Sequence, residues 1–505
     1  SFAGHIYFQA YRGSAGNGVY RSSGVPGGTT AFFPAAPPTT ASFSPVGMHG
    51  IGDTLYFTTG SSSAAHEGLW KAEGSLAVIT QLSSTPAAIV PPLGSIPFPR
   101  IVALPNERNF FGAGDNDNVE LWSSDGTPGG TSLLQDLYPG SPASSPARFA
   151  AVGEKLLFTA NMPLRGRDLW MSDGTPNGAA LVHDFAGSSA PFACLTMSDY
   201  VLVCASPNST AGLIDLWRSD GTPEGTVLLH NFQPDGFTST DTYIRADHRA
   251  FFRVSHQGYR RIAMSDGTPE GTRFLPFTDM MDILGSIADE AILTRPTPDG
   301  FELWRTDGDP DHTVLVATVV TGSSFREPSH VTKLGERLLF RCPTPAAGFE
   351  LWVTDGTPAG THIVRDISPG IESSYPNYLT PLRGLLYFAA HTPATGQELW
   401  VTDGTEIGTR LLGEVRPGPT GASIGAIVAT DNRVYFTADD GRTGLELWAV
   451  DVTPNPDFNQ SGLTDTQDLF DFFVAFFSGD PRADFDGSGV LDSNDFFEFL
   501  AAFLS

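Results

Sequence analysis

The sequence predicts an all-β propeller of about ten four-stranded blades, followed by a small α-helical domain. Of the 505 residues, 40% are hydrophobic and 17% are charged, and 55 glycines and 39 prolines mark many turns. This balance is typical of a β-rich chain with short strands. A chain of this length exceeds the size at which one hydrophobic core stops growing, so it contains several domains or a repeat. A repeat, and a change of composition near the C-terminus, decide the fold class.

One aromatic position recurs along the first 451 residues. Every tryptophan of the chain occupies it, and successive copies lie 40 to 52 residues apart, which is close to the length of a four-stranded propeller blade. A β-solenoid would need shorter rungs, and a string of sandwich domains about twice as many residues per unit. The ten positions are Tyr20, Trp70, Trp122, Trp170, Trp217, Met264, Trp304, Trp352, Trp400 and Trp448.

Each repeat divides into four strand-like segments. Each segment is short, contains β-branched or aromatic residues, and is bounded by Gly, Pro or Asp. In the copy that precedes the last one, the four segments are 378–384, 385–390, 398–404 and 409–415.

A turn with an Asp-Gly pair joins the third segment to the fourth. Asp355 can accept backbone N–H bonds there, Gly356 can take a positive φ, and Gly360 is expected to supply a second special backbone angle. Trp352, just before the turn, is expected to fill the wedge between neighbouring blades. Because each turn has one carboxylate and no second ligand, we interpret these turns as structural rather than as calcium or sugar sites.

The repeats at the two ends are incomplete, because the first begins at its second segment and the last stops at its third. We therefore expect either incomplete terminal blades or a strand donated by another chain, since open sheet edges pair readily. Donation would produce a head-to-tail homo-oligomer. Ten repeats fit one ring or two smaller rings, and the 40-residue step from Met264 to Trp304 is the expected irregular junction.

Charge and cysteine content exclude several classes of function. The net charge of −27 argues against nucleic acids and anionic lipids as partners, and favours divalent cations. No apolar run approaches the roughly 20 residues of a membrane span, and the first residues lack a signal peptide, so a secreted protein would have lost it. Three cysteines are too few for a disulfide scaffold; Cys194 and Cys204 are candidates for a hairpin disulfide, and Cys342 for a buried thiol.

The composition changes after residue 451. Residues 452–456 form a Pro-containing linker, and residues 457–505 contain ten acidic residues, one basic residue and eleven phenylalanines. Two 12-residue segments there match a calcium loop, which supplies oxygens at positions 1, 3, 5, 7, 9 and 12 and has Gly at position 6. The predicted Ca²⁺ ligands are Asp457, Asn459, Ser461, Leu463, Asp465 and Asp468 in the first loop, and Asp484, Asp486, Ser488, Val490, Asp492 and Asp495 in the second.

Each calcium loop is expected to open a helix with an apolar face. The small core between the helices is expected to contain Phe470, Phe473, Phe477, Phe497, Leu500 and Leu504. The other phenylalanines exceed what so small a module can bury, so some are expected to dock on a partner or on the propeller; they are Phe472, Phe476, Phe496, Phe499 and Phe503.

Two family resemblances follow from these motifs. Residues 1–451 resemble the ELW-x-x-DGT repeats of bacterial secreted proteins, with divergent copies at Val19, Gly68, Arg261 and Glu302. Residues 457–505 resemble a dockerin, an EF-hand-like module, of the type found at the C-termini of secreted planctomycete proteins. Ser at position 5 and Asp at position 12 depart from the commoner loop, so a modest calcium affinity is expected.

The sequence offers little for catalysis. The eleven histidines are scattered without zinc-ligand spacing, and the only suggestive arginine cluster is at 259–262. An enzyme would instead need Arg, Glu or His residues converging on the axis. We therefore predict a protein without enzymatic activity.

The function predicted from the resemblances is a secreted structural or adhesive protein of a bacterial cell surface. It would self-assemble into filaments, or bind a cohesin-like anchoring partner, through the calcium module. The alternative is a propeller that binds a glycan or protein ligand, tethered by the same module.

Overall fold

The structure is a computed structural model. It describes residues 6–11, 17–23, 25, 28–33, 44–51, 54–60, 68–73, 78–83, 101–105, 108–114, 119–140, 143–162, 166–185, 193–205, 215–232, 239–256, 259–276, 281–322, 327–430, 433–452, 458, 465–480, 483, 485 and 491–503. In this part of the chain, the strands form ten separate antiparallel sheets, numbered 1 to 10 in chain order, and two helices follow them.

The first five sheets occupy the N-terminal half of the chain. Sheet 1 has β1 (Ile6–Tyr11), β2 (Asn17–Ser22) and β3 (Thr29–Phe33). Sheet 2 has β4 (Ser44–Ile51), β5 (Thr54–Gly60), β6 (Gly68–Glu73) and β7 (Val78–Ser83). Sheet 3 has β8 (Val102–Ala103), β9 (Asn109–Ala113), β10 (Glu120–Ser124) and β11 (Ser132–Gln135). Sheet 4 has β12 (Ala147–Val152), β13 (Lys155–Met162), β14 (Gly166–Ser172) and β15 (Ala179–His183). Sheet 5 has β16 (Ala193–Thr196), β17 (Val201–Ala205), β18 (Asp215–Ser219) and β19 (Val227–Asn231).

The other five sheets continue the same pattern. Sheet 6 has β20 (Ser239–Ala246), β21 (Arg249–His256), β22 (Tyr259–Ser265) and β23 (Arg273–Phe274). Sheet 7 has β24 (Asp282–Ile287), β25 (Glu290–Thr297), β26 (Gly300–Thr306) and β27 (Val314–Val320), with the 3₁₀ turn η4 (Pro310–His312) before β27. Sheet 8 has β28 (Ser329–Leu334), β29 (Arg337–Thr344), β30 (Gly348–Thr354) and β31 (His362–Arg365). Sheet 9 has β32 (Asn377–Leu382), β33 (Leu385–Thr392), β34 (Gly396–Thr402) and β35 (Arg410–Gly413). Sheet 10 has β36 (Ile427–Ala429), β37 (Arg433–Asp439) and β38 (Leu445–Asp451).

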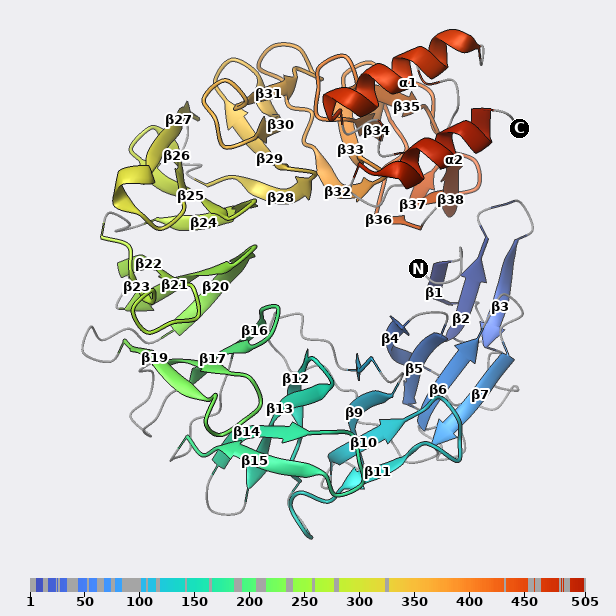
Figure 1. Cartoon of the computed structure of the whole chain (residues 1–505). Coiled ribbons are helices and arrows are strands. Elements are labelled where there is room, and N and C mark those ends of the chain that lie inside the picture. Colours follow the sequence, from blue (N-terminus) through green and yellow to red (C-terminus); the bar gives the residue numbers. More distant parts are fainter. Residues whose placement is uncertain are drawn as a thin grey trace.

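The sheets stand side by side around a common centre (Figure 1). In each sheet the strands follow one another in chain order, and several neighbouring first strands contact each other, as β28 contacts β32 and β32 contacts β36. The first strands therefore form the inner rim of the arrangement. The shortened 40-residue step falls between sheets 6 and 7, where β23 has only two residues.

The predicted fold class, an all-β propeller of about ten four-stranded blades, is wrong. Sheets 1 and 10 have three strands each, and within the described ranges no strand pairing joins them, so those residues form no closed propeller. A hydrogen bond from the Tyr435 hydroxyl to the Ser22 carbonyl, at 3.3 Å, links β37 to β2. Within the described ranges, strand pairing is confined to each sheet, so side-chain packing and isolated hydrogen bonds have to join it to its neighbours.

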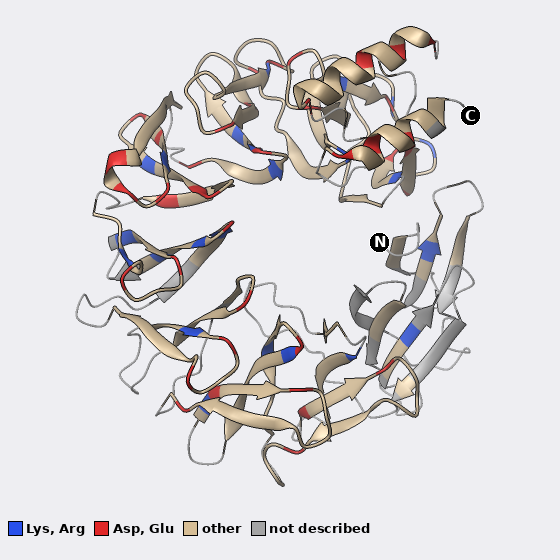
Figure 2. Ribbon diagram, viewed as in Figure 1, with Lys and Arg blue, Asp and Glu red and all other residues tan. Residues whose placement is uncertain are grey.

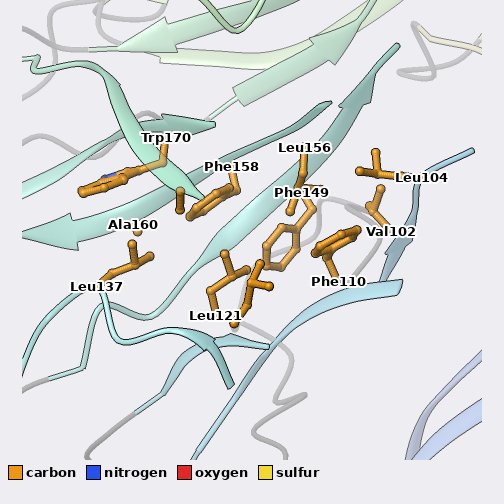
Figure 3. Close-up of a cluster of buried hydrophobic side chains, with 12 residues drawn as sticks. Val102, Leu104, Phe110, Leu121, Leu137, Phe149, Leu156, Phe158, Ala160 and Trp170 are labelled. Atoms are coloured by element: carbon orange, nitrogen blue, oxygen red, sulfur yellow. The ribbon is translucent and has the colours of Figure 1, made fainter. Parts of the chain in front are cut away.

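Hydrophobic clusters between adjacent sheets supply that packing. One cluster joins sheets 3 and 4 through Phe110, Leu121, Phe149, Phe158 and Trp170 (Figure 3). Trp170 is 6% exposed, and in other sheets the equivalent tryptophans pack against similar clusters. The prediction that the recurrent tryptophan fills the space between sheets is confirmed for Trp170.

The Asp-Gly turns satisfy their own polar groups. In sheet 8, the Thr357 amide and hydroxyl both donate to Asp355 Oδ1, at 2.8 and 2.7 Å, and Gly356 has a φ of +82°. The predicted second special angle at Gly360 is wrong, because its φ is not positive. A Cβ at Gly360 would instead lie 2.1 Å from the Asp355 carboxylate, so the close approach of that side chain requires glycine.

Helices α1 (Thr466–Ser478) and α2 (Ser493–Phe503) follow the sheets and lie beside the last of them in Figure 1. Arg383, in the turn between β32 and β33, donates from Nη1 to the Phe485 carbonyl at 3.0 Å and so connects the helical segment to sheet 9. Among the described residues, neither helix has the length and hydropathy needed to cross a bilayer.

The cysteines lie mainly within strands. The register of β16 and β17 pairs Cys194 with Val203 rather than with Cys204, so the hairpin does not place the two cysteines opposite each other. Cys342 is buried without a disulfide, and burial raises the pKa of its thiol to about 12. The thiol of Cys342 is therefore protonated at neutral pH.

Candidate functional site

The N-termini of the two helices have the same arrangement of carboxylates. At α1, Asp465 Oδ1 accepts from the Gln467 amide at 2.8 Å, and Asp468 Oδ2 accepts from the Asp465 amide at 2.9 Å. At α2, Asp492 Oδ1 accepts from the Asn494 amide at 2.7 Å, and Asp495 Oδ2 accepts from the Asp492 amide at 2.9 Å. These bonds satisfy backbone N–H groups that would lack partners at a helix N-terminus.

These four residues are positions 9 and 12 of the two predicted calcium loops. Asp468 and Asp495, at position 12, are 0% exposed, whereas Asp465 and Asp492 are exposed. Burying an ionised carboxylate is costly unless other groups compensate its charge. The other predicted ligands lie outside the described residues: Asp457, Asn459, Ser461, Leu463, Asp484, Asp486, Ser488 and Val490. Within the described ranges, no three His, Cys, Asp or Glu side chains are grouped as metal ligands.

The phenylalanines divide differently from the prediction. Phe472 and Phe499 are 0% exposed and stack face to face, with ring centroids 4.0 Å apart. Phe470, Phe477 and Phe497, which were predicted to be core residues, are 62%, 81% and 62% exposed. The prediction is wrong for these three residues, because the position-12 aspartates have to face inward with the residues that follow them by four positions, whereas Phe473 packs against the buried cluster as predicted.

Sequence reasoning missed a second set of buried carboxylates, in the repeats. The acidic residue two positions before the tryptophan is buried in sheets 3, 4, 5, 8 and 9, as Glu120, Asp168, Asp215, Glu350 and Glu398. Glu350 accepts from the Ile367 amide at 3.2 Å and from the Ser374 amide and hydroxyl at 3.1 and 2.5 Å. These bonds fasten the segment that leads from sheet 8 to sheet 9. The recurrence of Glu or Asp at this position was the signal that could have revealed the role.

Burial changes the ionisation of this carboxylate. It raises the pKa of Glu350 to about 7, although the hydrogen bonds from Ser374, Ile367 and Ser368 act in the opposite direction. Burial likewise raises the pKa of Glu398. Glu350 is therefore a buried acid that titrates near neutral pH.

Charged residues also converge near the inner rim of sheets 6 to 8. Arg253 and Arg260 both form ion pairs with Asp282, and Arg260 Nη1 lies 3.4 Å from Glu327 Oε1. Arg260 belongs to the arginine cluster noted in the sequence. Figure 2 shows basic and acidic segments on strands around the centre. These ion pairs connect sheet 6 to the first strand of sheet 7 and to Glu327 before sheet 8.

Comparisons with known proteins give only distant matches. No family model matches the chain, and no curated protein matches it. A solved structure described as puromycin hydrolase matches with 13% identity and a TM-score of 0.36, covering 78% of this chain and 58% of that chain. A structure from a study of two prolyl endopeptidases matches with 15% identity and a TM-score of 0.34, covering 67% of this chain and 54% of that one. A puromycin-hydrolyzing peptidase of Mycobacterium tuberculosis matches with 14% identity and a TM-score of 0.33, covering 69% of this chain and 58% of that one.

These neighbours correct the predicted function. They are described as a puromycin hydrolase, prolyl endopeptidases and a puromycin-hydrolyzing peptidase, all of them enzymes, so the prediction of a non-enzymatic, structural or adhesive protein is contradicted. The alternative prediction of a tethered glycan- or protein-binding propeller is contradicted as well. The predictions of self-assembly and filament formation are contradicted with it. The chain spans 54 to 58% of the length of these solved chains, and a likeness this distant assigns no peptidase activity to it.

Proposed function

We propose that residues 457–505 bind two calcium ions, one in each loop, and that the ions order the helix pair. The observation that carries the proposal is the burial of Asp468 and Asp495, which are 0% exposed at equivalent positions of two equivalent loops. Position 12 is where a calcium loop places the carboxylate that closes the coordination shell. A secreted, extracellular location and an anchoring partner remain predictions from the resemblance.

The electrostatics of this segment favour a divalent cation. Residues 457–505 contain ten acidic residues and a single basic one, Arg482. Like charges held this close repel one another, and oxygen-bound Ca²⁺ is the natural counterion for such loops. Because a loop of this kind is not preformed in the unfolded chain, the free energy of ion binding becomes free energy of folding.

The substitutions within the loops set the expected affinity. Ser461 and Ser488 supply neutral oxygens at position 5, and Asp at position 12 is one methylene shorter than the usual Glu. Fewer charged ligands weaken calcium binding, so we expect a dissociation constant of about 10⁻⁴ M or weaker, in the range of extracellular modules.

Isothermal titration of the full chain with Ca²⁺ tests the proposal. The chain should bind two ions, Asp468→Asn and Asp495→Asn should each bind one, and the double variant none. Asp471→Asn and Glu498→Gln remove the same charge from the same helices outside the loops, and should keep two sites. Loss of binding in these controls, or two sites in the double variant, would refute the assignment of the ligands.

A further inference from the structure

A group of polar and aromatic side chains occupies the inner rim where sheets 8 and 9 meet. We call it the inner-rim patch. It lies on β28 and β32, on the adjoining parts of β29 and β30, and in the segment that leads to β32. Its connected members are Ser329, Arg341, Phe349 and Tyr375, and His330 and Tyr378 lie on the contacting strands β28 and β32.

Arg341 is the charged centre of the patch. Its Nε donates to Ser329 Oγ at 3.3 Å, and its guanidinium lies over the Phe349 ring, 5.7 Å from the centroid. Burial lowers the pKa of Arg341, yet among the described residues no carboxylate forms an ion pair with it. A guanidinium carries five N–H donors, and only Nε has an acceptor in this part of the chain. Among the described residues, the Nη edge of Arg341 therefore has no hydrogen-bond acceptor.

Aromatic rings flank this guanidinium. Phe349 and Tyr375 stack with ring centroids 5.4 Å apart and an interplanar angle of 23°. Tyr375 is 52% exposed and Tyr378 is 42% exposed, which is high for side chains of this size next to an inner strand. The patch thus combines a cation with partly exposed aromatic rings.

The backbone at this rim is strained. His330, Tyr375 and Tyr378 have φ values of +53°, +46° and +55°. His330 and Tyr378 sit in equivalent register shifts of β28 and β32, where the strand is bulged. Bulky residues adopt positive φ only at a free-energy cost, and glycine would adopt it without that cost.

The same bulge recurs in sheet 4 with another large polar residue. Arg148 has a φ of +56° within the register shift of β12. Burial, and then the nearby charge of Arg148, lower the pKa of Arg167 to about 10. If the bulge served only to bend the strand, glycine would be the cheapest residue at all three positions. The side chains there are instead Arg, His and Tyr, and strained bulges that re-aim side chains are characteristic of binding sites.

We propose that the inner-rim patch binds a small organic carboxylate with a planar body. The carboxylate would accept two hydrogen bonds from the Nη edge of Arg341, and the body would pack against the rings of Tyr375 and Tyr378. A planar guanidinium matches a carboxylate in a two-point contact, and aromatic rings favour a planar apolar partner. The exposed His330 imidazole lies on the same strand as Ser329 and adds a polar group at the edge.

Titration of the full chain with benzoate tests this site, and benzamide is the neutral ligand of the same shape. Benzoate should bind with a dissociation constant of about 10 mM or lower, and benzamide should bind at least about ten-fold more weakly. Arg341→Met keeps an apolar stem over Phe349 and should abolish the difference between the two ligands. Lys333→Met removes a positive charge from the far end of β28 and should change nothing.

A second variant separates binding from folding. Tyr378→Gly relieves the positive φ, so it should keep the thermal stability of the chain while weakening benzoate binding by about ten-fold. Equal binding of benzoate and benzamide, unchanged benzoate affinity in Arg341→Met, or no benzoate binding up to about 10 mM would overturn the proposal. Calcium binding is not required for this site, so its test is independent of the calcium titration.

Discussion

The repeats and the helix pair both bury carboxylates completely, but they compensate them in different ways. In sheet 8, Glu350 is 0% exposed and accepts hydrogen bonds from the Ile367 amide and from Ser374. In the helix pair, Asp468 and Asp495 are also 0% exposed, and each accepts from a helix-capping amide while ending a loop of further acidic residues.

The difference lies in the sign of the charges around the buried group. Around Glu350 the donors are neutral and belong to the chain, so the site is complete within the protein and its acid is partly protonated near neutral pH. Asp468 and Asp495 end loops whose sequence is acidic, and in the proposed function an ion completes each site. A buried carboxylate of a repeat therefore holds the chain segment that leads to the next sheet, whereas the buried carboxylates of the helix pair are proposed to be metal ligands.

Removal of calcium should have the largest effect on this comparison. Chelation should destabilise the helix pair by about 3 kcal/mol for each ion, if calcium is present at about 100 times Kd. Hydrogen exchange should then accelerate in 466–478 and 493–503 and stay unchanged in the strands of sheet 8. Acceleration in sheet 8 as well would show that the ions stabilise the whole molecule, and would end the distinction.

Truncation of the Glu350 side chain should have the next largest effect. Glu350→Ala leaves the Ile367 and Ser368 amides without their side-chain acceptor, which should cost about 3 kcal/mol of local stability. Exchange of amides in 366–374 reports this loss. Glu372→Ala removes an exposed acid from the same segment and should have little effect. An equal response to both variants would contradict the role assigned to Glu350.

The pH dependence of the same segment should follow the raised pKa of Glu350. The unfolded chain ionises Glu350 near its ordinary value of 4.5, whereas the folded chain does so at about 7. The folded state thus binds the proton more tightly, so the stability from this group is full below pH 4.5 and is lost as the pH rises through about 7. The difference should approach about 3 kcal/mol.

Hydrogen exchange of the amides in 366–374, corrected for intrinsic rates, should therefore give a lower free energy of local opening at pH 8 than at pH 5. Glu350→Gln, which cannot ionise, should abolish the trend. A segment that becomes more stable as the pH rises would show that the carboxylate form is the one the fold prefers.

The sequence allowed the repeat to be predicted well because the repeat is local. Strand periodicity, the Asp-Gly turns and the tryptophan position all depend on residues close in the chain. Closure depends on how the first and last sheets meet, which no local pattern encodes, and the predicted propeller of about ten four-stranded blades was wrong. The prediction of the buried helix face was wrong for a similar reason, because Phe470 and Phe472 have the same chemistry and only packing distinguishes them.

The inner-rim patch was beyond sequence reasoning for a related reason. Arg341 and Tyr375 come from different segments, and the positive φ of Tyr378 arises from strand pairing. The acid two positions before seven of the eight tryptophans, in contrast, was visible as a recurrent residue. Its role needed the structure, because its partners lie 17 to 24 residues further along the chain.

The exposed turn carboxylates complete the comparison and should show the smallest effect. Asp355 Oδ1 accepts from the Thr357 amide and hydroxyl, but these groups reach water when the side chain is removed. Asp355→Ala should therefore cost about 1 kcal/mol, and Asp355→Asn, which keeps the acceptor oxygen, a few tenths. Exchange of amides in 356–361 measures both. A loss near 3 kcal/mol in Asp355→Ala would show that Asp355 acts like the buried Glu350. Only a donor that cannot reach water after the substitution carries so large a cost.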